Sequence, residues 1–285
     1  MGEDLYVAYM DNKHLIKQNA PAHITNFNYP DGCNYELSNW ITKKSAQTLE
    51  MLRYCGEGSG SLKDVLFDDD GQVIVYPRLR DLCVFDCNDG KGELKTDKSI
   101  VPFPVLQHLR VYSNCIFKDD TLFRGSGKTL ISLGIGLHRG FVDIFRKYKL
   151  FSQGAYPNIL HISATHDIKS SLALPADEFA KAVFGLISAA TQSMTINGGI
   201  AYQHIASIMP TSPYLKNIQI LKCTSTILSL LEILGVFKYF PHITDFECSF
   251  RGIDSDLGAI QDKLIPSHLG MQYSQLSSRL KCLHL

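Results

Sequence analysis

The chain has 285 residues, of which 45% are hydrophobic and 20% are charged, a composition ordinary for a soluble protein with a sizeable core. Lys plus Arg and Asp plus Glu both number 28, so the formal net charge is zero and the basic excess of a typical nucleic-acid binder is missing. The most apolar run, residues 226–240, is too short to span a bilayer and is interrupted by Glu232. These features argue against a nucleic-acid partner and against insertion into a membrane.

Residues 1–20 carry early acidic residues and lack the apolar stretch of a signal peptide. We expect a helical lead-in over this segment. Because no secretory signal is recognisable, the eight cysteines are expected to be reduced thiols in a cytoplasmic or nuclear protein.

From residue 24 onward, the frame L-x-x-L-x-L can be placed ten times. The fourth and sixth positions are apolar in every copy, whereas the fifth position is always polar or small. This alternation predicts a short strand with one buried face in each repeat. The first positions of the ten copies are Ile24, Leu49, Leu79, Leu106, Leu130, Ile159, Thr191, Leu215, Ile243 and Leu280.

Proline supports the frame independently. Five of the 11 prolines lie two residues before a first position, and four of these five follow Tyr or Phe. Proline suits this place because the first residue of a strand can lack an N–H for the ladder. The five are Pro77, Pro104, Pro157, Pro213 and Pro241.

Helical patterns separate several of the predicted strands. The pattern over 177–190 begins with acidic residues after Pro175, as the start of a helix should. The other predicted helices cover 141–150, 200–209 and 225–237. Three segments rich in Gly and Asp, 56–61, 68–71 and 87–93, predict solvated turns.

Three segments match the pattern L-x-x-L-x-L-x-x-N/C: LRDLCVFDC (79–87), LQHLRVYSN (106–114) and LKNIQILKC (215–223). On these segments the chain resembles the leucine-rich-repeat family. The resemblance implies an α/β solenoid (horseshoe) of about ten irregular repeats over 21–285, with a concave parallel sheet and convex helices. It also implies that the last Cys or Asn of each segment lies where the chain turns off the sheet. The frame stops at Leu285 without a polar cap, so we expect that a C-terminal cap is missing.

The repeated F/Y-P-x-L pattern and the segment DDTLFRG (119–125) are similar to fungal F-box/leucine-rich-repeat proteins. This resemblance implies the substrate-receptor part of a ubiquitin ligase. No F-box is recognisable in residues 1–48, so a cullin-ligase adaptor would be recruited through an F-box missing from this chain.

The segment GSGKT (125–129) invites a nucleotide-binding interpretation. A phosphate loop needs a glycine at position 122, where the chain has Leu122, and it needs a preceding strand. We therefore interpret GSGKT as a loop before a strand. A nucleotide-hydrolysing enzyme that uses Lys128 is kept as the lesser alternative.

No other motif indicates catalysis or a metal site. Cys83 and Cys87 have no second pair at zinc-finger spacing, and neither G-x-S-x-G nor H-E-x-x-H occurs. His161 and His166 flank a predicted strand beside Asp167, and we interpret them as surface residues. We expect no catalytic residue, no cofactor and no metal.

The third, fifth and seventh positions of the repeats should point away from the helices. Arg and aromatic residues gathered on an exposed sheet are typical of binding hot spots. We therefore predict a non-catalytic scaffold that binds a protein partner on the concave face. The alternative is a degenerate structural repeat protein with no specific ligand. The predicted protein-binding residues are Arg53, Phe85, His108, Arg110, Tyr112, His161, Asp245 and Glu247.

Overall fold

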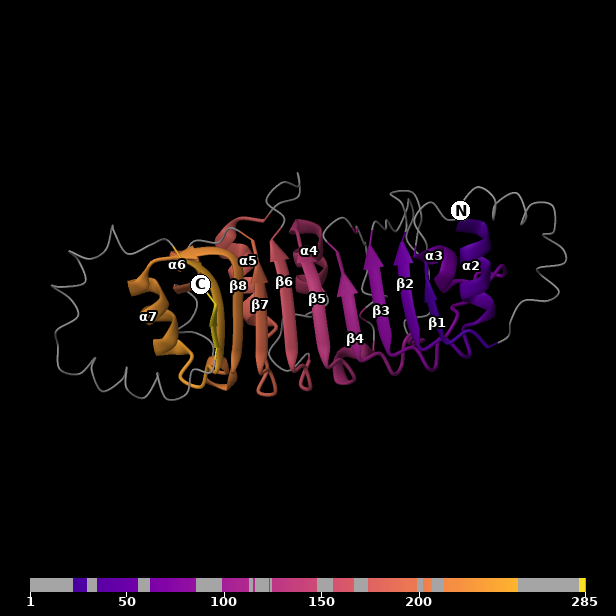
Figure 1. Ribbon diagram of the computed structural model, residues 1–285. Helices are drawn as coiled ribbons and strands as arrows, with labels where there is room; N and C mark the ends of the chain where they lie inside the picture. Colours follow the sequence, from indigo (N-terminus) through magenta and orange to yellow (C-terminus); the bar gives the residue numbers. More distant parts are fainter. Residues whose placement is uncertain are drawn as a thin grey trace, which may run out of the picture. The chain divides into compact units, whose positions relative to one another are not determined.

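The computed structural model describes residues 23–29, 35–55, 62–85, 99–112, 115, 123, 125–147, 156–166, 174–198, 202–206, 213–250 and 282–284. The chain forms two compact units, Met1–Leu130 and Ile131–Leu285. In each unit the described strands are parallel, and their order in the sheet follows their order in the chain (Figure 1). This confirms the predicted α/β fold and is typical of a solenoid of the leucine-rich-repeat kind.

The first unit contains four described strands: β1 (Asn26–Asn28), β2 (Met51–Cys55), β3 (Asp81–Phe85) and β4 (His108–Val111). Helix α2 (Tyr35–Lys44) follows β1, and α3 (Lys63–Leu66) follows β2. Neither helix was among those predicted. The short 3-10 helix η1 (Ser126–Lys128) lies near the end of the unit.

In the second unit, the strands are β5 (Ser132–Leu137), β6 (His161–His166), β7 (Ser193–Asn197), β8 (Ile220–Leu228), β9 (Asp245–Phe250) and β10 (Cys282–His284). The intervening helices are α4 (Arg139–Lys147), α5 (Ala176–Gly185), α6 (Tyr202–Ala206), the 3-10 helix η3 (Leu215–Asn217) and α7 (Leu230–Tyr239). A helix therefore overlaps each of the four predicted ranges, and where the described residues allow comparison, as in α5 and α7, the ends are shifted.

Two of these shifts have a local cause. Helix α5 ends at Gly185, before the predicted residue 190, and the chain then turns as the N–H of Ser188 donates to the hydroxyl of Thr191. Helix α7 begins after Ser229 rather than at residue 225, because β8 continues to Leu228. Ser229 and Glu232 form a capping box, each side chain accepting from the other residue's backbone N–H.

The frame positions one, four and six form the core. In β2, β3 and β4 the fourth position is Leu52, Leu82 and Leu109, and each is at most 2% exposed. Helices pack on this face of the sheet: the Phe237 ring of α7 lies 5.3 Å from the Phe246 ring of β9. The buried first positions are Leu49, Leu79, Leu106, Leu130, Ile159, Thr191 and Ile243.

In four repeats, the proline pattern marks the turn with which the repeat starts. Tyr76 precedes Pro77, and its carbonyl accepts a hydrogen bond from the N–H of Leu79 at 3.3 Å. Proline is favoured at the second position of such a turn because its φ angle is already suitable. The same bond joins Phe103 to Leu106, Tyr156 to Ile159, and Phe240 to Ile243. All four aromatic rings are buried, so the F/Y-P-x-L pattern combines a turn with a core residue.

In one repeat, the predicted frame is wrong by three residues. The frame started at Leu215, but Leu215 lies in η3 and its carbonyl accepts from the N–H of Ile218 at 3.1 Å. Leu215 thus occupies the place of the turn aromatic, and Ile218 is the true first position. Cys223 is therefore buried at the sixth position, rather than placed at the turn.

Long-range pairing explains this error. The segment LKNIQILKC satisfies the frame from Leu215 and again from Ile218, so the pattern alone does not distinguish the two starting positions. The register of β8 on β7 pairs Leu221 with Met194, which places Leu221 at the fourth position.

The predicted turn over 68–71 is confirmed: the carboxylate of Asp68 accepts from the N–H groups of Asp70 and Gln72 at 3.0 and 2.7 Å. The predicted lead-in over 1–20, the turns 56–61 and 87–93, and the residues Cys87, Asn114 and Asp167 lie outside the described residues.

Candidate protein-binding face

The open side of the first unit carries the outward positions of β2, β3 and β4. The side chains on it are exposed or half-buried, whereas their neighbours along each strand are buried. All five binding residues predicted in this half of the chain lie on it. We call it the unit 1 face, formed by Met51, Arg53, Asp81, Cys83, Phe85, His108, Arg110 and Tyr112.

An aromatic and cationic cluster lies at the carboxyl ends of these strands. The Arg53 guanidinium lies 5.0 Å from the centroid of the Phe85 ring, in a cation–π arrangement. The Phe85 and Tyr112 rings meet edge to face, with centroids 6.1 Å apart. Phe85 is half-buried and Tyr112 is 49% exposed. The cluster therefore connects β2, β3 and the end of β4 in one continuous surface.

Next to this cluster, one row of the sheet places a thiol between two arginines. Arg53 is the register partner of Cys83, and Cys83 is the partner of Arg110. Burial raises the pKa of the Cys83 thiol, and the positive charges of Arg53 and Arg110 oppose that rise. Both arginine side chains are exposed, so their charges are available to a ligand.

The corresponding face of the second unit is different in character. Its middle strands carry small polar side chains, such as Ser163 and Thr195. Glu247 forms an ion pair with Lys222, whose Nζ lies 3.0 Å from Glu247 Oε2. Lys222 was missed because the three-residue error in the frame placed it outside the outward positions.

The three residues predicted to bind a partner in the second unit do not form a cluster. His161 and Asp245 lie in the same row, but on β6 and β9, which three strand spacings of about 4.8 Å separate. Asp245 Oδ2 accepts a hydrogen bond from Thr244 at 2.7 Å. Only Glu247 has a charged partner, Lys222, on this face in the described part of the unit. The cluster that most resembles a hot spot is therefore in the first unit.

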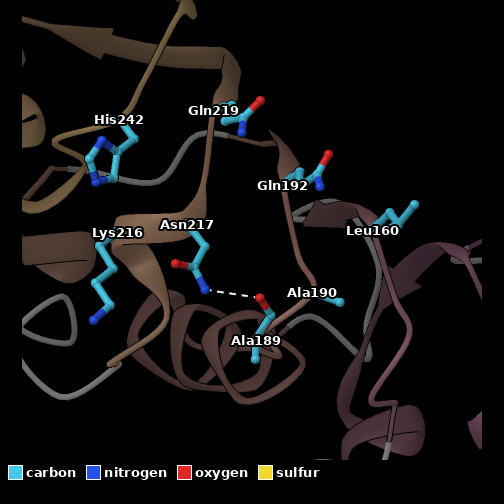
Figure 2. Close-up of a pocket in the computed structure, with 8 residues that line it drawn as sticks. All are labelled: Leu160, Ala189, Ala190, Gln192, Lys216, Asn217, Gln219 and His242. Atoms are coloured by element: carbon cyan, nitrogen blue, oxygen red, sulfur yellow. Dashed lines mark hydrogen bonds between the residues drawn. The ribbon is translucent and has the colours of Figure 1, made fainter.

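A polar pocket of about 420 Å³ opens beside the amino ends of the strands in the second unit (Figure 2). Asn217 lines this pocket, and its side-chain amide donates to the carbonyl of Ala189 at 2.9 Å. Its lining contains Lys216 and His242, but no carboxylate, hydroxyl or thiol side chain. None of the predicted binding residues lines it.

The GSGKT segment has a structure unlike that of a phosphate loop. Residues Ser126–Lys128 form η1, and the buried hydroxyl of Ser126 donates to the carbonyl of Phe123 at 2.8 Å. The next regular element is the strand β5. A phosphate loop is instead followed by a helix, whose N-terminus faces the phosphates.

The surface interpretation holds for His161 but is wrong for His166. His161 is exposed, whereas His166 is buried and its Nε2 lies 2.8 Å from the carbonyl oxygen of Leu174. The His166 ring also packs 4.7 Å from the Phe179 ring of α5. His166 thus belongs to the interface between β6 and the helix.

Within the described ranges, no three His, Cys, Asp or Glu side chains gather in a way that could hold a metal ion. None of the helices in that part of the chain is long and apolar enough to cross a membrane.

Comparison with models of protein families finds no match, and comparison with curated proteins finds none. The class of protein follows from the fold: an α/β repeat protein whose described strands are parallel and in chain order, with a hydrogen-bonded turn before several of them.

Proposed function

We propose that this chain is a non-catalytic scaffold that binds a protein partner through the unit 1 face. The observation that carries the proposal is the contiguous cluster of Arg53, Phe85 and Tyr112 on the open side of the sheet. Aromatic and arginine side chains are enriched among the residues that contribute most to protein binding.

The strands beneath the cluster favour this role. Tyr112 donates its backbone N–H to the carbonyl of Val84 at 3.1 Å, so the end of β4 is tied to β3. Phe85 is also the register partner of Cys55 in β2. A backbone held in paired strands loses little further freedom on binding, which favours affinity.

We further propose that the partner is a substrate of a ubiquitin ligase. Its support is the resemblance of the F/Y-P-x-L pattern and of DDTLFRG to fungal F-box/leucine-rich-repeat receptors. In that case a cullin-ligase adaptor would join through an F-box that residues 1–48 do not contain in recognisable form.

The test is affinity purification of the tagged chain from its source cells, with partners identified by mass spectrometry. The double variant Arg110→Ala/Tyr112→Ala removes two outward side chains, and Arg78→Ala/Val105→Ala removes an exposed arginine and an exposed apolar side chain from the turns before β3 and β4. We expect the first variant to lose the partners and the second to retain them, with both folded by circular dichroism.

Each other outcome has a definite meaning. Cullin-ligase components recovered with a longer form of the protein would support the receptor proposal, and their absence would leave a plain scaffold. Partners retained by Arg110→Ala/Tyr112→Ala would show that the unit 1 face is not the binding surface. Recovery of no partner would favour the degenerate repeat protein.

A further inference from the structure

The unit 1 face has an imbalance of charge. Arg53 and Arg110 project from it as exposed cations, and the half-buried His108 lies in the neighbouring row. Asp81 is the only carboxylate among the face residues, and its register partners are Met51 and His108 rather than either arginine. The row that holds the two arginines therefore contains no negative charge on β2, β3 or β4.

We propose that this face binds an extended acidic segment of a partner protein, with two carboxylates three residues apart that meet Arg53 and Arg110. The inference rests on the proposed function and adds the chemistry of the partner. Arginine suits this role because its planar guanidinium can donate two parallel hydrogen bonds to one carboxylate.

The spacing of the arginines sets the spacing of the carboxylates. Arg53 and Arg110 are on β2 and β4, on either side of Cys83 in β3, so their backbones are separated by two strand spacings, about 9.6 Å. A peptide in the polyproline II conformation repeats its side-chain direction every three residues, over about 9.3 Å. A segment that crosses the strands with acidic residues at i and i+3 therefore matches the spacing of the two arginine backbones.

The adjacent row gives such a segment an apolar edge. Phe85 and Tyr112 lie two residues beyond Cys83 and Arg110 along their strands, on the same side of the sheet. An acidic peptide crossing at the arginines would run beside these rings, which can contact its apolar groups. We thus expect selected peptides to combine the acidic pair with an apolar or proline residue.

The experiment is selection of a phage-displayed random peptide library on the full chain, followed by affinity measurements with the selected peptides. Arg53→Gln/Arg110→Gln removes both charges, and Arg78→Gln removes one exposed arginine outside the face. We expect enrichment of Asp or Glu pairs at i and i+3, at least a ten-fold loss of affinity for the double variant, and less than a two-fold change for Arg78→Gln.

Cys83 provides a second measurement on the folded protein. Because its thiol lies between the two arginines, a bound segment should slow its alkylation by iodoacetamide. Mass spectrometry of the peptide that contains residues 81–85 measures the rate of this alkylation. We expect at least a five-fold slower reaction with a saturating selected peptide. An unchanged rate would contradict the placement of the segment over this row.

The outcomes separate this inference from the proposed function. Selected peptides that need Tyr112 but tolerate Arg53→Gln/Arg110→Gln would leave the binding face in place and overturn the acidic partner. If no selected peptide depends on either the arginines or Tyr112, both proposals fail. Enrichment of acidic pairs at another spacing would overturn the crossing geometry.

Discussion

The guanidinium of Arg53 lies over the ring of Phe85 at 5.0 Å, and the two residues come from neighbouring strands of one sheet. Thirty-odd residues of chain separate them, yet the parallel register places Arg53 beside Cys83, two positions before Phe85. The contact holds a cation on an aromatic surface that also reaches Tyr112. The proposed binding through the unit 1 face depends on this cluster.

Phe85→Ala should weaken binding of a partner or selected peptide by at least about ten-fold, which corresponds to about 1.4 kcal/mol. The change removes the ring that supports Arg53 and contacts Tyr112. Isothermal titration calorimetry measures the affinity, and urea unfolding shows whether stability has changed. Equal affinities for Phe85→Ala and the wild type would remove Phe85 from the binding surface.

Two buried tyrosines offer a matched test of the turn motif. The Tyr76 hydroxyl donates to the carbonyl of Val65 at 2.5 Å, whereas the buried Tyr156 hydroxyl has no hydrogen-bond partner among the residues that the structure describes. Tyr76→Phe should lower the free energy of unfolding by about 1–2 kcal/mol, because the Val65 carbonyl then remains buried and unpaired.

Tyr156→Phe is the control for that change, and it should leave the free energy of unfolding unchanged or slightly higher. Urea unfolding of both variants gives the comparison. Equal effects of the two changes would show that the Tyr76 hydrogen bond contributes nothing to stability.

Alkaline pH should destabilise the second unit through its buried thiols. Burial, together with the neighbouring Cys248, raises the pKa of Cys223 from 9.0 to about 12. In the unfolded chain the thiol ionises near its ordinary pKa, so the folded state holds its proton more tightly. The resulting stability is complete below pH 9 and is lost as the pH rises from about 9 to about 12.

Urea unfolding at a series of alkaline pH values, under reducing conditions, measures this slope. Cys223→Ala removes the titrating group and should give a shallower decrease between pH 9 and pH 12 than the wild type. The half-buried Cys83 is a suitable comparison, because Cys83→Ala should change the slope less. Parallel profiles for wild type and Cys223→Ala would contradict the prediction.

Gly198→Ala should destabilise the second unit by about 2–3 kcal/mol or more, since it combines backbone strain with a collision. Gly198 has φ of +135°, and an added Cβ would lie 2.6 Å from the Cβ of His166. Gly71 has φ of +77° and open space around an added Cβ, so Gly71→Ala should cost only about 1 kcal/mol. Thermal unfolding distinguishes the two, and a larger loss for Gly71→Ala would refute the collision.

The fold was largely predictable because each repeat carries a recognisable pattern of residues that are close together in the sequence. Leu49 and Leu79 begin their frames as predicted, and Pro77 marks the turn between Tyr76 and Leu79. The local pattern was insufficient to determine the strand register where two registers satisfy it, as at Leu215 and Ile218. There the pairing of β8 with β7 decides the register, and sequence spacing does not contain that information.

Part of the candidate site was accessible in the same way. The outward placement of Arg53 and Arg110 follows from the period of two along a strand. The contact of Arg53 with Phe85 depends on side-chain rotamers, and the burial of His166 depends on a helix that packs against the end of β6. Neither is encoded in the spacing of residues within one repeat.

The most direct test of the central claim is the affinity of one purified partner for three forms of the full chain. These forms are the wild type, Arg110→Ala/Tyr112→Ala and the control Arg78→Ala/Val105→Ala. Loss of two hot-spot side chains should weaken binding by at least about 100-fold, or about 2.8 kcal/mol, while the control should bind within about two-fold of the wild type. If the two double variants bind equally well, the unit 1 face is not where this protein meets its partner.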